Sequence, residues 1–198
     1  VLEPDIEGFT CNIPMMRIHA FGAGGGSIAR VKDGKLSVGP VSAGAVPGPA
    51  CFNLGGQEAT LTDANLVLGI LDSGYFLGGT MQLDIARATA AIEEKVAIPL
   101  GVSVQEAACL IRSGVERAMG QQVEKVRGNF PPTVEPLVIA YGGAGAAHAC
   151  AIADHAGLKR ILLTPFSAVS SAFSSSLMDA GHQYYRKIDR SLADTGVQ

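Results

Sequence analysis

Apolar positions recur at helical spacing through the middle of this chain. The strongest stripe runs from Ala107 to Val123, and it follows Ser103 and Glu106, whose spacing is that of a capping box. A helix places such positions on one face, where they can be buried together. The pattern therefore predicts the longest helix of the protein, from Ser103 to about Arg127.

Two shorter helices are predicted before it. Asp84 can cap a helix that continues to about Val96, and Pro99 to Gly101 then ends it. Further upstream, Thr62 or Asp63 can cap a short helix, because a side-chain oxygen there satisfies free N–H groups of the first turn.

The hydrophobic pattern changes before residue 60. Ser27 to Val31 and Lys35 to Val38 predict the strands of a hairpin, with Asp33-Gly34 as its turn. From Pro40 to Gly56 the prolines and glycines exclude a regular helix. The small apolar residues of this segment indicate an ordered loop rather than a disordered one.

The last third of the chain alternates strand and helix signals. Leu137 to Tyr141 predicts a buried strand, residues 146–156 a helix closed by Gly157, and Arg160 to Thr164 a second strand. This is the pattern of a β-α-β unit, which pairs its strands in parallel with a right-handed crossover. Ser167 to about Ala180 is predicted to be helical.

These elements indicate one α/β domain over residues 1–198. It contains a hairpin and an ordered loop at 20–60, a mainly helical region at 62–127 and the β-α-β unit at 136–165. A composition of 47% hydrophobic and 17% charged residues allows a sizeable core, built mostly from small aliphatic side chains because only 7 phenylalanines and no tryptophan are present.

Charge and cysteine usage narrow the class of protein. A formal net charge of −3 without a run of lysines or arginines argues against nucleic acid and anionic membranes as partners. The four cysteines (Cys11, Cys51, Cys109 and Cys150) form no Cys-x-x-Cys pair, so we expect reduced thiols and no structural metal. The sequence shows neither a long apolar run nor a basic leader, so we expect a cytoplasmic protein.

The strongest candidate site is the turn between the predicted strand and helix of the β-α-β unit. Gly142, Gly143 and Gly145, with Ala144 between them, let a ligand approach the backbone, while the following helix presents free N–H groups. Such a turn suits an adenosine or a phosphate. The alternative is that the glycines only allow close packing of helix and sheet. His148 lies just inside this helix, as a ligand contact or as a packing residue.

A second glycine segment precedes the hairpin. Gly24, Gly25 and Gly26, followed by Ser27, permit the alternating backbone conformation of an anion-binding nest. The segment has no lysine and is no Walker A loop; the alternative is a tight turn. Asp63 is a further candidate, for magnesium or substrate, with helix capping as its alternative.

Two other groups carry reactive side chains. Cys51 is a possible nucleophile, but no base lies near it in the sequence and buried cysteines are common. His182 lies close to Asp179, Tyr184 and Tyr185, a cluster that suits acid-base chemistry or a polar interface. We favour the interface, and the sequence identifies no catalytic residue.

Several motifs in one order resemble the hydantoinase A / oxoprolinase family. They cover roughly residues 15–188 and read GAGGGSIA, VGPVSAGAVPGPACF, TDANLVLG, FLGG and YGGAGAAHA. The family is similar to the actin, sugar kinase and heat-shock chaperone superfamily. The resemblance therefore implies part of an actin-like, ribonuclease-H-like lobe with a helical insertion.

The same resemblance implies that a nucleotide binds close to the two glycine segments. Gly142, Gly143 and Gly145 would belong to the adenosine-side loop, and residues 24–27 would lie near the phosphates or the substrate. ATP and Mg²⁺ would be bound together with other parts of a complex. The implied partners are a small-molecule substrate, a hydantoinase B-type large subunit and the remaining part of the hydantoinase A-type subunit.

Two chemistries compete within the family, and both activate an oxygen by phosphorylation. One opens cyclic amides such as hydantoins or oxoproline, and the other carboxylates ketones such as acetone or acetophenone. The segment LLTPFSAVSSAFSSSLMDAGHQYY is more similar to the ketone carboxylase branch. The chain departs from the superfamily in lacking both Asp-x-Gly-Gly-Thr-like phosphate hairpins. It resembles the C-terminal part of a subunit, and a non-catalytic assembly subunit is a further alternative.

Overall fold

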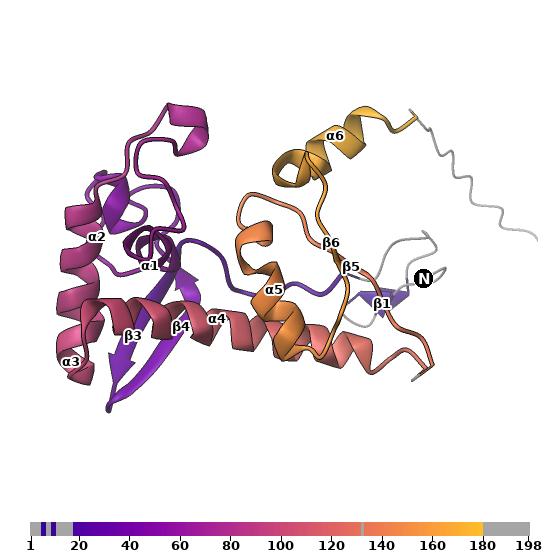
Figure 1. The fold of residues 1–198 in the computed structure, drawn as a ribbon, viewed down its shortest axis with the longest axis horizontal. Helices are drawn as coiled ribbons and strands as arrows, with labels where there is room; N and C mark the ends of the chain where they lie inside the picture. Colours follow the sequence, from indigo (N-terminus) through magenta and orange to yellow (C-terminus); the bar gives the residue numbers. More distant parts are fainter. Residues whose placement is uncertain (1–4, 7–8, 11–17, 132, 180–198) are drawn as a thin grey trace, which may run out of the picture.

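The structure, a computed structural model, describes residues 5–6, 9–10, 18–131 and 133–179 (Figure 1). Its strands are β1 (Asp5–Ile6), β2 (Phe9–Thr10), β3 (Ser27–Lys32), β4 (Lys35–Ser42), β5 (Val138–Ile139) and β6 (Ile161–Leu162). Its α-helices are α1 (Leu61–Val67), α2 (Ile85–Ile92), α3 (Ile98–Leu100), α4 (Val104–Arg127), α5 (Gly145–His155) and α6 (Ser170–Ser176).

The long helix α4 organises the molecule. Figure 1 shows it along the length of the structure, with the β3–β4 hairpin, α1 and α2 beside its first half and α5 with the β5–β6 pair beside its second half. Ser103 begins α4 as predicted, because its side chain accepts a hydrogen bond from the Glu106 N–H at 3.2 Å. Lys125 and Arg127 lie in the last turn, where they complement the helix dipole.

Two hydrophobic cores flank α4. The larger joins α1, α2 and the start of α4, and its fully buried members include Leu61, Ile92 and Ile111. The smaller core packs Ala153, Ala156 and Leu158 around the end of α5, with Val123 of α4 against them. Burying a leucine or isoleucine side chain contributes about 1.5 to 3 kcal/mol, so α4 is stabilised from both ends.

The helix predictions are confirmed with changes at their ends. Asp84 caps α2 through the Arg87 N–H at 3.0 Å, and the helical path continues through a π-helical turn at Glu93–Ala97 into α3. The predicted start of α1 is wrong by two residues. Thr60 is its cap, and Asp63 completes a reciprocal capping box instead of beginning the helix.

The hairpin is confirmed and its second strand is longer than expected. Asp33 and Gly34 form its turn, both with positive φ (51° and 69°), which a tight hairpin turn requires. β3 and β4 pair antiparallel, and β4 continues to Ser42 instead of ending at Val38.

The β-α-β unit is confirmed. β5 and β6 pair in parallel on either side of α5, and Gly157, at φ 64°, follows the end of that helix. The prediction that 137–141 forms a buried strand is wrong, because Leu137 is 50% and Ile139 is 55% exposed. Within the part of the chain that the structure describes, β6 is the only strand paired with β5, so the other edge of β5 is unpaired there.

The predicted helix after Ser167 is present as a 3-10 turn at Ser167–Val169 followed by α6. Among the described residues, no single helix has both the length and the apolar character needed to cross a membrane. Where the structure describes the chain, one helix pair, Ile85–Leu100 with Val104–Arg127, reaches such a length and composition together, and the two are bent by 88° at their junction. Both contribute buried residues to the larger core.

Candidate functional site

The glycine turn between β5 and α5 is exposed, and hydrogen bonds fix its backbone. Gly142 has φ 91°, a conformation that side chains disfavour, and its N–H donates to the Ser167 carbonyl at 2.8 Å. The Gly145 N–H donates back to the Gly142 carbonyl at 3.2 Å. One hydrogen bond therefore holds the turn internally, and another joins it to Ser167, in the 3-10 turn that precedes α6.

Open space surrounds the turn. A Cβ added at Gly142, Gly143 or Gly145 would meet no atom within 4 Å among the described residues. This observation disfavours close helix–sheet packing as the reason for the glycines. Ala144 precedes α5 and supplies no side-chain cap, so the first N–H groups of α5 have no side-chain acceptor there. The turn can admit a ligand to its backbone.

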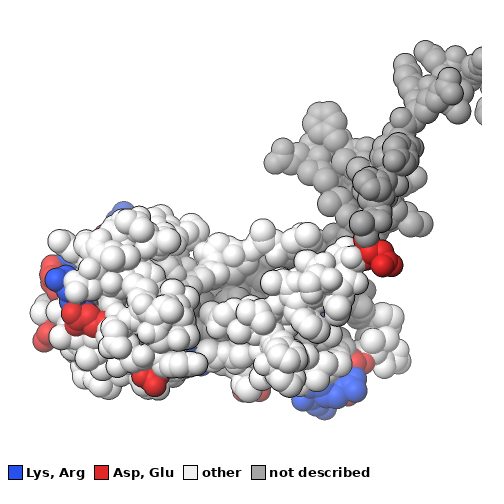
Figure 2. Space-filling model, turned by 90° about the horizontal axis from the view of Figure 1, so that it is seen from above, with Lys and Arg blue, Asp and Glu red and all other residues white. Residues whose placement is uncertain are grey.

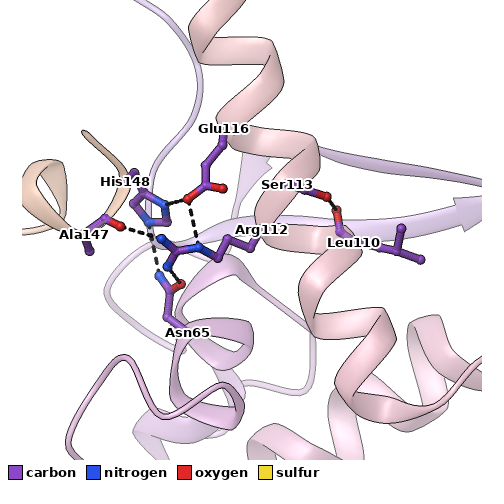
Figure 3. A network of polar contacts seen from close by, with 7 residues as sticks. All are labelled: Asn65, Leu110, Arg112, Ser113, Glu116, Ala147 and His148. Atoms are coloured by element: carbon purple, nitrogen blue, oxygen red, sulfur yellow. Dashed lines mark hydrogen bonds and ion pairs between the residues drawn. The ribbon is translucent and has the colours of Figure 1, made fainter. Parts of the chain in front are cut away.

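His148 points away from solvent into a polar network (Figure 3). It is 4% exposed, and its Nδ1 lies 2.9 Å from Oε1 of Glu116 while its Nε2 lies 3.2 Å from Nδ2 of Asn65. Both ring nitrogens thus have partners within the protein. The geometry favours the packing alternative for this histidine, and a nucleotide contact through it stays a prediction.

Arg112 completes this network. Its Nε lies 2.8 Å from Oε1 of Glu116, and its Nη1 donates to Oδ1 of Asn65 at 3.0 Å. Its Nη2 donates to the Ala147 carbonyl, in the first turn of α5. The sequence alone did not identify Asn65, Arg112 and Glu116 as candidates. A signal was available, because Arg112 and Glu116 are four positions apart beside the apolar stripe of α4.

The other glycine segment is a tight turn packed on α1. The Ser27 N–H donates to the Gly24 carbonyl at 2.9 Å, and the Gly25 carbonyl accepts from the Thr62 N–H at 2.8 Å. None of Gly24, Gly25 and Gly26 has positive φ, so the geometry favours the tight-turn alternative over an anion-binding nest.

Packing explains the glycines of this segment. A Cβ on Gly25 would lie 2.6 Å from Oγ1 of Thr62, and one on Gly26 would lie 2.7 Å from Oγ of Ser42. Gly24 has no such neighbour among the described residues. α1 contacts Gly25 through Thr62, and it contacts α5, the helix after the other glycine turn, through Asn65 and His148. That residues 24–27 lie near phosphate or substrate stays a prediction.

Asp63 is buried and its carboxylate is occupied by donors of the protein. It accepts from the N–H groups of Cys51 at 2.8 Å, Ala50 at 3.3 Å and Thr60 at 2.9 Å, and from the Thr60 hydroxyl at 2.7 Å. These bonds fix the ordered loop before residue 56 to the start of α1. The geometry favours capping over contact with magnesium or substrate.

Cys51 is buried beside this carboxylate. Burial is the largest cause that raises the pKa of this thiol well above its usual range, and the neighbouring Asp63 carboxylate is the next. A protonated, buried thiol is a poor nucleophile, so the geometry favours the structural alternative here too. Of the other cluster, only Asp179 is described, and His182, Tyr184 and Tyr185 lie outside the described residues.

Metal-binding side chains do not gather in the described structure. Across 18–131 and 133–179, no three His, Cys, Asp or Glu residues are placed so that they could hold one ion. The carboxylate that the sequence suggested for magnesium, that of Asp63, is already occupied by protein donors.

Comparisons with known proteins identify relatives across nearly the whole chain. The family model described as hydantoinase/oxoprolinase matches residues 1–184. The acetophenone carboxylase gamma subunit of Aromatoleum aromaticum is 42% identical over 92% of this chain and 25% of that protein. The caprolactamase subunit alpha of Pseudomonas jessenii is 39% identical over 98% of this chain and 28% of that protein.

A solved structure supports the same relationship. The nucleotide-free structure of acetone carboxylase, an enzyme of ATP-dependent acetone carboxylation, matches with a TM-score of 0.76 and 29% identity over 86% of this chain and 24% of that one. The chain spans about a quarter of the length of these relatives.

Proposed function

This chain belongs to the hydantoinase/oxoprolinase family, and from that premise we propose that it contributes the adenosine side of an ATP site in an ATP-dependent ketone carboxylase. The site would lie in an actin-like α/β lobe. The open glycine turn at Gly142–Gly145 carries the proposal, because its backbone is accessible and its glycines are not required by packing among the described residues. The N–H groups at the start of α5, which no side chain caps, suit an electron-rich ligand.

The chemistry proposed is phosphoryl transfer from ATP to an enolate or bicarbonate oxygen. Catalysis of this kind rests on positioning and on neutralising charge. This chain would position the nucleotide and supply no catalytic side chain. Since protein donors occupy the Asp63 carboxylate, Mg²⁺ would be bound by the nucleotide phosphates and by other parts of the complex.

The proposed partners are a hydantoinase B-type large subunit and the remaining part of a hydantoinase A-type subunit. Exposed apolar side chains on β5 and at the end of α6, such as Ile139 and Leu177, are suited to burial against such a partner. The same observation supports the alternative of an assembly role without catalysis. Omitting the chain would then dissociate the complex rather than only slow its turnover.

A cyclic amide hydrolase is the second candidate. It is favoured by the caprolactamase relative, whose 39% identity is close to the 42% of the carboxylase relative. Both reactions would use the same nucleotide site, so the substrate separates them.

Substrate-dependent ATP hydrolysis tests the two candidates. The assembly purified from its own host through this chain would be given ATP with acetone or acetophenone and bicarbonate, or with a hydantoin, oxoproline or caprolactam. Stimulation by ketone and bicarbonate supports the carboxylase, and stimulation by a cyclic amide supports the hydrolase. Hydrolysis that no substrate stimulates contradicts both.

The glycine turn is tested separately with Gly143→Asp. The substitution has space around it, so we expect unchanged thermal stability, while the added charge opposes binding of an anionic nucleotide. Binding of a fluorescent ATP analogue by the assembly should be lost. Gly114→Asp, at an exposed position on α4, is the matched control. Equal binding by the two variants contradicts the assignment.

A further inference from the structure

A closed network of four side chains joins three helices. Asn65 comes from α1, Arg112 and Glu116 from α4, and His148 from α5. Figure 3 shows these side chains turned toward one another at the place where the helices meet. Asn65, Glu116 and His148 are each at most 5% exposed, and no buried side-chain N or O atom in the described structure lacks a partner.

The bonds of the network define where its protons lie. Oδ1 of Asn65 accepts from Arg112, so the amide NH₂ of Asn65 faces Nε2 of His148. Nε2 must then accept, and the ring proton sits on Nδ1, from which it is donated to Glu116. The histidine is neutral in this arrangement, and Glu116 balances the charge of Arg112. Both ring nitrogens are thus bonded within the network.

The network reaches the glycine turn through α5. Arg112 donates to the carbonyl of Ala147, two residues after Gly145, and His148 is the next residue along the helix. The planar guanidinium makes three contacts in fixed directions, to Glu116, Asn65 and Ala147. These contacts fix both the rotation and the distance of the first turn of α5 relative to α1 and α4.

We propose that Asn65, Arg112, Glu116 and His148 are positioning residues for the glycine turn. A buried ion pair contributes little net stability compared with apolar packing, whereas it specifies one geometry. Here that geometry sets where the backbone of residues 142–145 meets its ligand. The inference rests on the proposed function for the identity of that ligand, a nucleotide, and the experiment separates the two.

The test compares Arg112→Met with Arg117→Met in the purified assembly. Arg117 is an exposed arginine of the same helix, so the control removes the same charge outside the network. Affinity for trinitrophenyl-ATP is measured well below the unfolding temperature. We expect Arg112→Met to weaken binding by at least about tenfold, since small displacements of a binding group are costly. Arg117→Met should bind as the wild type does.

Conservative variants and amide hydrogen exchange distinguish positioning of the glycine turn by these four residues from a contribution to stability alone. Glu116→Gln keeps an oxygen that can accept from both partners, so it should bind nucleotide more tightly than Arg112→Met does, and Arg112→Lys should bind with intermediate affinity. Without nucleotide, peptides covering residues 142–150 should exchange faster in Arg112→Met than in Arg117→Met. If Arg112→Met is not recovered folded, Arg112→Lys decides the comparison.

Wild-type affinity together with unchanged exchange in Arg112→Met overturns the proposal, even if its melting temperature falls. If the wild-type assembly does not bind trinitrophenyl-ATP, that result contradicts the proposed function and not the positioning role. The exchange comparison then still decides whether the network positions the turn.

Discussion

At the scale of single residues, the buried carboxylate of Asp63 has a structural role. Its oxygens accept hydrogen bonds from Ala50, Cys51 and Thr60. Charged groups are buried in proteins when their hydrogen-bonding capacity is satisfied, as it is here. The residue joins the short 3-10 helix Ala50–Phe52 to the first turn of α1, and so fixes the loop that carries it.

Replacing Asp63 by Asn should therefore destabilise the protein. The amide nitrogen cannot accept, so one group of donors loses its partner in the interior, at a cost of about 3 kcal/mol. Asp72→Asn is the control, because the exposed Asp72 makes one local bond to the Gly74 N–H. Thermal denaturation measures both. Similar melting temperatures for the two variants would show that the buried bonds contribute little.

Cys51 should resist alkylation in the folded protein. Burial and the Asp63 carboxylate raise the pKa of its thiol, so the reactive thiolate is not formed and labelling stays slow when the pH is raised to about 9. Cys109 and Cys150 are exposed and should react with iodoacetamide. Peptide mass spectrometry before and after denaturation resolves the sites. Rapid labelling of Cys51 in the native state would contradict the described burial.

At the scale of elements, the crossing of α4 and α5 depends on close approach. A Cβ on Gly120 would collide with Cβ of His155 and lie 3.1 Å from the Ile152 carbonyl. The absence of a side chain at Gly120 lets the backbones come together, next to the smaller core. This crossing carries the β-α-β unit on the helix that also supports the larger core.

Gly120→Ala should loosen this crossing and lower the free energy of unfolding by about 1 to 3 kcal/mol, the usual cost of overpacking. Gly114→Ala is the matched control, because Gly114 is an exposed position of the same helix. There alanine should stabilise by about 0.5 to 1 kcal/mol through its helix propensity. Urea unfolding measures whether each substitution lowers or raises the free energy of unfolding. Stabilisation by both substitutions would contradict the close crossing of α4 and α5.

At the scale of the whole molecule, two hydrophobic cores on one helix meet at a polar network. The two groups of elements beside α4 lie at different places along it (Figure 1). On the face seen in Figure 2, charged side chains gather toward the two ends of the described part, and the middle shows few of them. Phe166 and Met178, at 59% and 76% exposure, belong to the apolar surface near the end of the described chain.

This surface leads us to expect the chain within a larger assembly. Native mass spectrometry of the species purified from its own host, followed by titration with an ATP analogue, measures this directly. We expect a mass well above 20.4 kDa, the mass of this sequence, together with nucleotide binding. A lone 20.4 kDa species without nucleotide affinity would contradict the proposed site and place the activity in other chains.

The sequence by itself determined the elements whose signals are local. Ser103 and the apolar stripe define α4, Asp33-Gly34 defines the hairpin turn, and the order of strand, glycine turn and helix defines the β-α-β unit. Each depends on residues a few positions apart, so backbone propensity and side-chain period suffice. The order of the glycine motifs also indicated the family, as the family match over residues 1–184 confirms.

Only the tertiary structure decided how these elements use their polar residues. Asn65 and His148 are 83 positions apart, and their contact exists because α1 and α5 pack on the same helix. Likewise, the glycines at 25–26 and at 142–145 look alike in sequence, but the first approach neighbouring side chains and the second border open space. Local patterns do not encode which surfaces meet, and that meeting determines which polar groups are buried together.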